Sequence, residues 1–136
     1  MISVLIVDDH ELFRAGLRSR LERERDITPV GEADTVEQAV TRARSLQPDV
    51  VLLDLLLPRT SGYEAIPALA EASPRSKVLV VSSQAAPSAV RRALCAGAAG
   101  YLPKRASASE LVTCHTACGG RRRLRRARSR CEAHPR

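Results

Sequence analysis

Short apolar runs rich in β-branched residues alternate along the chain with stretches in which apolar residues recur at helical spacing. The strongest runs predict strands at 3–7, 50–54 and 77–83, and weaker candidates lie at 27–33 and 100–103. The three strong runs are continuously apolar, which is typical of strands covered on both faces. The pattern therefore predicts a sheet buried between two layers.

Five segments have the periodicity of helices. They comprise a face of Leu12, Phe13, Gly16, Leu17 and Leu21, a face of Val36, Ala39, Val40, Ala43 and Leu46, and the stretches 61–72, 87–97 and 107–120. Asp34 with Glu37 resembles a capping box, and Pro87 and Gly97 suit the first turn and the end of a helix. Pro67 lies inside a helical segment, where proline costs about 3 kcal/mol, so we expect a kink or an early start there.

This alternation of strand and helix predicts one fold class. Parallel strands need crossover connections, and right-handed crossovers place helices on both faces of the sheet. The chain is therefore expected to form a doubly wound α/β fold with a five-stranded parallel sheet. In such folds ligands bind outside the carboxyl ends of the strands, at the switch point of strand order.

Polar residues gather where the predicted strands end. They are Asp8 and Asp9 after the first strand, Asp54 at the end of the third, Ser82 and Ser83 at the end of the fourth, and Lys104 after the fifth. Polar residues can simply mark where strands stop. The excess of carboxylates, with no histidine and no Gly-rich phosphate loop expected beside them, indicates a binding site instead.

Three neighbouring carboxylates repel one another, and a divalent cation removes the repulsion. Mg²⁺ prefers oxygen ligands and keeps several waters beside one or two carboxylates and a phosphate. A carboxylate can also act as a nucleophile and form an aspartyl phosphate. Lys104 and the Ser82 hydroxyl would then neutralise the oxygens of the transferred group. We therefore interpret Asp54 as a phosphate acceptor that faces a metal ion.

The motifs around these residues resemble those of response-regulator receiver domains in two-component signalling. They read "LIVDDH", "LLDLLLP", "VLVVSSQ" and "GYLPK", in the same order and spacing as in that family. The segment "VDDHELFRAGLRSRLE" is most similar to the NarL/FixJ type, in which a LuxR-type helix-turn-helix normally follows the receiver. The resemblance covers about residues 2–112.

The resemblance implies a flavodoxin-like fold with strand order 2-1-3-4-5, and it implies a role for each site residue. Asp54 would be the phosphoacceptor, with Mg²⁺ held by Asp8, Asp9, Asp54 and the backbone carbonyl of Leu56, and with Ser82, Ser83, Tyr101 and Lys104 binding the phosphoryl group or switching. The donor would be a sensor histidine kinase. The surface around the fourth helix, fifth strand and fifth helix would change, and it often forms a homodimer or binds a partner.

Two departures from the family pattern affect these expectations. Leu56 and Gln84 lie two residues beyond the acceptor and the switch serine, and both positions tune the loss of phosphate in the family. Leu56 cannot guide an attacking water, so slow self-dephosphorylation is expected. Pro103 precedes Lys104, and no proline follows it, so a cis peptide there would be a costly non-proline one.

The charge is unevenly divided along the 136 residues, of which 44% are apolar. Residues 1–118 carry 14 basic and 14 acidic side chains and are expected to form the receiver domain, whereas residues 119–136 carry eight Arg and one Glu. The net charge of +7 therefore belongs to a basic tail, which we expect to be disordered. A chain of this length is expected to hold one domain.

Three interpretations of the tail remain open. Its arginines could bind nucleic acid without sequence specificity, since no aromatic residues are interleaved with them. Cys114, Cys118, Cys131 and His134 could hold zinc, although the first two also fit the apolar face of a helix. The tail could also be an out-of-frame translation or a natural truncation of a longer transcriptional regulator, which would explain the missing DNA-binding output domain.

Other function classes are weaker. A metal-dependent phosphatase can also use an aspartate nucleophile after a strand, but it usually needs a second Asp two residues later, where this chain has Leu56. We expect a phosphoacceptor with at most self-phosphorylation and self-dephosphorylation activity rather than an enzyme. No apolar run approaches the roughly 18 residues of a membrane span, and the N-terminus lacks a basic leader, so a cytoplasmic location is expected.

Overall fold

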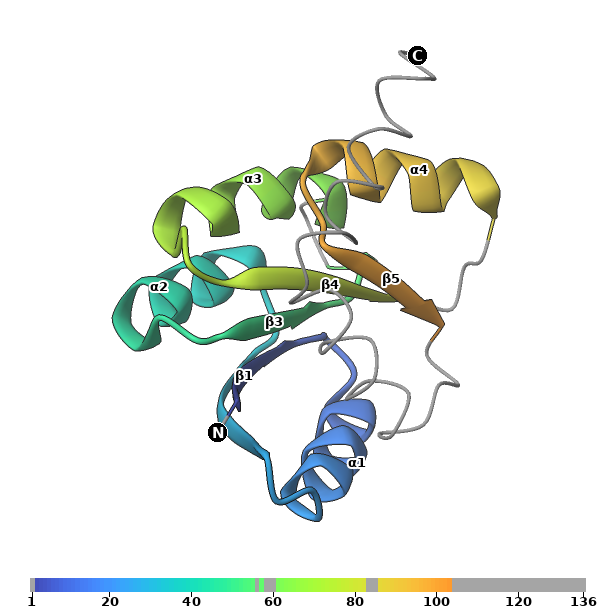
Figure 1. Ribbon diagram of the computed structural model, residues 1–136. Helices are drawn as coiled ribbons and strands as arrows, with labels where there is room; N and C mark the ends of the chain where they lie inside the picture. Colours follow the sequence, from blue (N-terminus) through green and yellow to red (C-terminus); the bar gives the residue numbers. More distant parts are fainter. Residues whose placement is uncertain (1, 56, 58–60, 83–85, 104–136) are drawn as a thin grey trace.

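The computed structural model describes residues 2–55, 57, 61–82 and 86–103, in which five strands alternate with four helices (Figure 1). The strands are β1 (Ile2–Val7), β2 (Ile27–Ala33), β3 (Val50–Leu53), β4 (Lys77–Ser82) and β5 (Gly100–Pro103), and the helices are α1 (Glu11–Glu22), α2 (Val36–Leu46), α3 (Gly62–Ala72) and α4 (Pro87–Ala96). None of these helices is long and apolar enough to cross a membrane. The predicted helix at 107–120 lies outside the described residues.

The five strands form one parallel sheet in the order β2-β1-β3-β4-β5. The predicted fold class and strand order are therefore confirmed. The order reverses at β1, because the chain moves outward from β1 to β2 and then returns to place β3 on the other side of β1. The carboxyl ends of β1 and β3 flank this switch point, where doubly wound folds bind their ligands.

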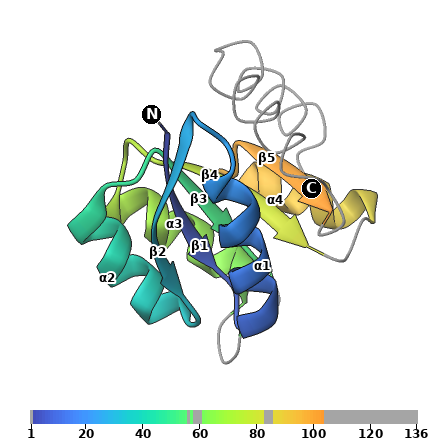
Figure 2. The ribbon, with the colours of Figure 1, turned by 90° about the horizontal axis from the view of Figure 1, so that it is seen from below.

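The sheet is buried on both faces by two separate apolar clusters. One contains Leu5, Val51 and Val80 with residues of α2, α3 and α4, while the other contains alternate strand residues such as Ile6 and Leu52 with residues of α1. Figure 1 shows α2, α3 and α4 above the sheet and α1 below it, and Figure 2 shows the same layers from below. The alternation follows from the period of two in a strand, and it explains why the strands read as continuous apolar runs.

The edge strand β2 contains an irregularity at its proline. Val4 pairs with Pro29 but Leu5 pairs with Gly31, so Val30 is an extra residue on the edge strand. Proline has no N–H to donate to a ladder and is confined to edges and bulges of sheets. The bulge thus follows from the position of Pro29 in the sequence.

The helix ends agree with the sequence, with one correction. The cap of α2 is Thr35, whose Oγ1 accepts a hydrogen bond from the Gln38 amide at 3.2 Å, rather than the predicted pair of Asp34 and Glu37. Helix α4 begins at Pro87 and ends at Ala96, and Gly97 follows as its C-cap with φ of 119°, as expected. Helix α3 runs without interruption through Pro67.

Candidate functional site

The parallel register places two aspartates side by side. Val7 pairs with Leu53 at the carboxyl ends of β1 and β3, so Asp8 and Asp54 are the next residues of adjacent strands. The Asp54 amide donates to the Val7 carbonyl oxygen at 2.9 Å, which continues the ladder by one bond. Asp8 and Asp54 therefore lie next to each other at the carboxyl ends of these two inner strands.

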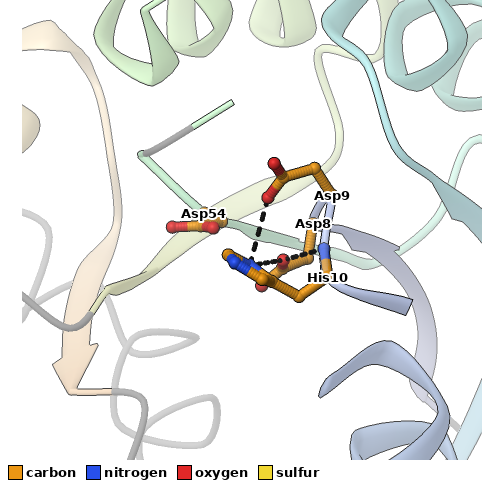
Figure 3. Close-up of side chains that lie close together, drawn as sticks. All are labelled: Asp8, Asp9, His10 and Asp54. Carbon is orange, nitrogen blue, oxygen red and sulfur yellow. Dashed lines mark hydrogen bonds and ion pairs between the residues drawn. The ribbon is translucent and has the colours of Figure 1, made fainter. Parts of the chain in front are cut away.

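These two aspartates belong to a compact group of possible metal ligands. Asp8, Asp9, His10 and Asp54 each offer one ligand atom within 4.8 Å of the others. Figure 3 shows these four side chains close together. Asp8 and Asp54 are each only 1% exposed, whereas Asp9 and His10 are exposed. The buried pair is thus at the base of the group and the exposed pair at its rim.

Two basic side chains contact the loop that follows β1. Nδ1 of His10 lies 3.0 Å from Oδ1 of Asp8 and 3.1 Å from Oδ1 of Asp9. From α1, the guanidinium of Arg14 donates a hydrogen bond to the Asp8 backbone carbonyl and forms an ion pair with Glu32 at 3.1 Å. The arginine therefore ties the acidic loop to both α1 and β2.

The donor set suits a divalent cation. Three carboxylates crowd into one region, and burial of two of them makes their mutual repulsion costly unless positive charge is nearby. Mg²⁺ takes hard oxygen ligands in near-octahedral geometry. The three aspartates predicted as metal ligands are therefore brought together in a group whose chemistry fits the ion.

The remaining predicted site residues are distributed differently. Ser82 is fully buried at the end of β4, where it pairs with Pro103, and Tyr101 is half-buried on β5. The other predicted positions lie outside the described residues: Leu56, Ser83, Gln84, Lys104, Cys114, Cys118, Cys131 and His134. The described part of the site therefore comprises the acidic group and the end of β4.

Two features of this region did not follow from the sequence. We expected no histidine near the carboxylates, but His10 joins them; its place directly after Asp9 was the available signal. Near the start of α3, the Arg92 guanidinium carbon lies 4.1 Å from the ring centroid of Tyr63. Burial and the charge of Tyr101 raise the pKa of Tyr63 above 10.0, although Arg92 lowers it.

Comparison with known proteins decides the family. The family described as "Response regulator receiver domain" matches residues 4–115 of the chain. The chain belongs to this family. Receiver domains are the signal-receiving modules of two-component systems, and response regulators are generally non-enzymatic signal transducers. Receiver domains bind Mg²⁺ at an acidic pocket, and the aspartate group described above has that character.

Curated relatives of this receiver domain are whole response regulators. The chain is 42% identical over 112 residues to the response regulator GacA of Pseudomonas viridiflava, a match that covers 82% of this chain and 52% of GacA. It is 40% identical over 111 residues to VraR of Staphylococcus epidermidis, covering 82% of this chain and 53% of VraR. The chain thus spans about half the length of the curated relatives it matches.

Solved structures share the fold. The signal receiver domain of the response regulator NarL from Mycobacterium tuberculosis superimposes with a TM-score of 0.81 at 34% identity, covering 88% of this chain and 98% of that domain. A LuxR-family response regulator from Aurantimonas sp. SI85-9A1 also gives a TM-score of 0.81, at 28% identity, covering 95% and 99% of the two chains. The expected NarL/LuxR-type resemblance is confirmed.

Proposed function

We propose that this receiver domain accepts a phosphoryl group from a sensor histidine kinase onto Asp54, with Mg²⁺ held at the acidic group. The proposal assigns the metal to Asp8, Asp9, Asp54 and the backbone carbonyl of Leu56. It assigns phosphoryl binding and switching to Ser82, Ser83, Tyr101 and Lys104. We further propose that residues 1–118 form the receiver and that the protein is cytoplasmic.

The position of Asp54 is the observation that carries this proposal. Its carboxylate is 1% exposed, yet it lies beside Asp8 at the edge of the sheet rather than within an apolar cluster. A buried carboxylate without a function would be expensive to retain. Its placement at the switch point of a doubly wound sheet, next to two further aspartates, supports an acceptor role better than a structural one.

The proposed step transfers a phosphoryl group from a phosphohistidine donor to the carboxylate of Asp54. A carboxylate oxygen of Asp54 attacks phosphorus, an O–P bond forms, and the P–N bond of the kinase phosphohistidine breaks with the electron pair going to the imidazole. Mg²⁺, when bound, neutralises charge on the phosphoryl oxygens and on the crowded carboxylates. Asp8 and Asp9 would hold the ion, and the burial of Asp8 and Asp54 would limit access of water to the acyl phosphate.

Switching would follow from the new charge. An acyl phosphate adds three acceptor oxygens and close to two negative charges, which need donors nearby. Ser82 at the end of β4 would supply a hydroxyl, and Tyr101 lies on the adjacent strand in register with Val80. Movement of Ser82 toward the phosphate would bias the surface formed by α4, β5 and the predicted fifth helix. That surface is proposed to bind a partner or a second copy.

The output of the signal belongs to the proposal only as a prediction. Because the chain spans about half of each curated relative, regulation of transcription through DNA binding would depend on sequence beyond the matched half. The basic segment 119–136 is expected to add a nonspecific, salt-dependent attraction to nucleic acid. A gel-shift assay at rising salt measures that attraction separately from phosphorylation.

The deciding experiment is labelling of the full chain by acetyl phosphate or a phosphorylated histidine kinase in the presence of Mg²⁺. Wild-type protein should acquire a label that hydroxylamine releases, as expected of an acyl phosphate, and EDTA should prevent labelling. Asp54→Asn should abolish the label because an amide oxygen is a poor nucleophile. Asp26→Asn is the matched control. Asp26 is exposed and follows the C-terminal end of α1, whereas the acidic loop precedes the N-terminal end of that helix.

Two outcomes would contradict the proposal. Persistent labelling of Asp54→Asn would place the acceptor elsewhere. Continuous release of phosphate from a phosphomonoester by the wild-type protein, lost in Asp54→Asn, would indicate a phosphatase that uses the same carboxylate.

A further inference from the structure

The imidazole of His10 lies among the proposed metal ligands but has no role in the proposed phosphotransfer. His10 is the N-cap residue of α1, but its side chain makes no cap hydrogen bond. N-cap positions favour Ser, Thr, Asp and Asn because their side chains accept from the first free amides of a helix. Histidine is a poor choice for that purpose, and here Nδ1 points instead at the carboxylates of Asp8 and Asp9.

The spacing of these atoms matches a coordination shell. Two neighbouring ligands of an octahedral ion, each about 2.1 Å from the metal, lie about 3 Å apart. Nδ1 of His10 lies 3.0 Å from Oδ1 of Asp8 and 3.1 Å from Oδ1 of Asp9. Asp54 adds a further donor atom within 4.8 Å of the others. Three oxygens and one nitrogen therefore lie close enough together to hold one ion, which would replace the hydrogen bond between His10 Nδ1 and Asp8 Oδ1.

We propose that His10 is a metal ligand of this receiver and that it gives the site a preference for nitrogen-binding divalent transition ions. This inference rests on the metal site of the proposed function. Imidazole suits Zn²⁺, Ni²⁺ and Cu²⁺, whereas Mg²⁺ is held by oxygens. A site of carboxylates alone already binds transition ions more tightly than Mg²⁺, so the contribution of His10 is the additional preference that disappears without the imidazole.

The backbone makes His10 suitable for substitution. Its amide donates to Oδ1 of Asp8 at 2.7 Å, and this contact does not depend on the side chain. The imidazole is 61% exposed, so its removal opens no cavity in the core. His10→Ala is thus expected to keep the acidic loop in place while removing the nitrogen donor.

The experiment uses the full chain with His115→Ala and His134→Ala as background, because the sequence has three histidines and this leaves His10 alone. Calorimetric titrations with Ni²⁺ and with Mg²⁺ are compared with and without His10→Ala. The Ni²⁺ dissociation constant should rise about tenfold or more in His10→Ala, and that of Mg²⁺ should change less than about twofold. The background protein itself should keep the Ni²⁺ affinity that wild type shows at this site.

A spectroscopic measurement tests ligation directly. With ¹⁵N-labelled histidine in the same background, Zn²⁺ should shift the Nδ1 resonance of His10, and Asp54→Asn should weaken that response. An unshifted Nδ1 resonance would overturn the proposal. So would equal weakening of Ni²⁺ and Mg²⁺ in His10→Ala, which would make His10 a positioning residue, and so would unchanged or tighter binding of both ions.

The two proposals fail separately. A chain that binds Ni²⁺ through His10 but takes no label on Asp54 would retain this inference and lose the phosphoacceptor. A chain that is labelled on Asp54 but whose Ni²⁺ affinity is the same with and without His10→Ala would retain the phosphoacceptor and lose this inference.

Discussion

The backbone amide of Gly62 donates a hydrogen bond to the carbonyl oxygen of Leu55 at 3.1 Å, and the two backbones are in direct contact. A Cβ at position 62 would lie 2.5 Å from Cα of Leu55 and 3.0 Å from the carbonyl oxygen of Asp54. The first residue of α3 therefore supports the chain immediately after the proposed acceptor. Only glycine permits so close an approach.

Gly62→Ala should disturb this support. Because the contacts are with backbone atoms, the new methyl group must displace the chain around Asp54, at a cost of about 1–3 kcal/mol in the free energy of unfolding. Urea denaturation measures the loss, and phosphoryl labelling should become slower as Asp54 moves. Gly16→Ala is the control: Gly16 is exposed on α1 and nothing lies within 4 Å of a Cβ there, so helix propensity should stabilise that variant by about 0.5–1 kcal/mol. Equal stability of the two variants would show that the close contact is absent in solution.

Arg14 should contribute more to stability than its neighbour Arg18, although both form ion pairs with Glu32. The Arg14 side chain is 15% exposed and also donates to the Asp8 carbonyl, whereas that of Arg18 is 50% exposed. Arg14→Ala should lower the free energy of unfolding by about 1.5–3 kcal/mol, since charged hydrogen bonds in partly buried positions are strong. Arg18→Ala should cost less than about 1 kcal/mol.

The same two variants show whether Arg14 only stabilises the fold or also positions the acidic loop for metal binding. Arg14→Ala should raise the Mg²⁺ dissociation constant because the Asp8 backbone loses its tie to α1, and Arg18→Ala should leave it unchanged. Both quantities can be measured on the same samples by urea denaturation and calorimetry. Loss of stability without any change in Mg²⁺ affinity would confine Arg14 to the packing of α1 against β2.

Mg²⁺ itself should stabilise the folded chain. An ion that binds only the native state adds about 2.7 kcal/mol to the free energy of unfolding at about 100 times its dissociation constant. EDTA should remove that increment from wild type. Asp8→Asn should lose most of the increment, because one buried anionic ligand is gone, while Asp26→Asn keeps it. An increment that survives in Asp8→Asn would place the ion elsewhere on the chain.

The strands and both faces of the core could be predicted because burial leaves a direct trace in the sequence. Residues such as Leu52 and Leu53 point to opposite faces, and each face must be apolar to be covered. The parallel arrangement then brings Asp8 and Asp54 together, since strands of one direction end at one edge. The sequence did not predict which of two neighbouring polar residues makes a given contact. Thr35 rather than Asp34 caps α2, because capping depends on which side chain meets the free amide.

His10 shows the same limit at the site. Its sequence position placed it beside the aspartates, but a residue directly before a helix can point to solvent, to the helix or to the preceding loop. The contacts of its Nδ1 with Asp8 and Asp9 in the structure decide between these directions. The sequence therefore predicted the location of the acidic site more reliably than the full set of its donor atoms.

Tyr63 should make the stability of the protein depend on alkaline pH. Burial, with a smaller contribution from Tyr101, raises the pKa of the folded Tyr63 phenol above 10.0, the value expected when the chain is unfolded. As the pH rises past 10.0, the unfolded chain loses this proton while the folded chain keeps it, so the unfolded state is favoured. The contribution is fully present below that pH and is lost as the pH rises through the folded pKa. The free energy of unfolding of wild type, compared with Tyr63→Phe, should therefore fall across this window.

Arg92 gives this prediction a test of sign. Its guanidinium lies over the Tyr63 ring and lowers the phenol pKa, so Arg92→Met should raise that pKa further. The near-ultraviolet absorbance of tyrosinate follows the titration. Tyr101→Phe is introduced into both wild type and Arg92→Met, so that Tyr63 is the only tyrosine left in each protein. Because the Tyr101 charge also raises the pKa, this background should titrate at lower pH than Tyr63 does in wild type. A titration that moves to lower pH in Arg92→Met would show that the cation does not face the ring in solution.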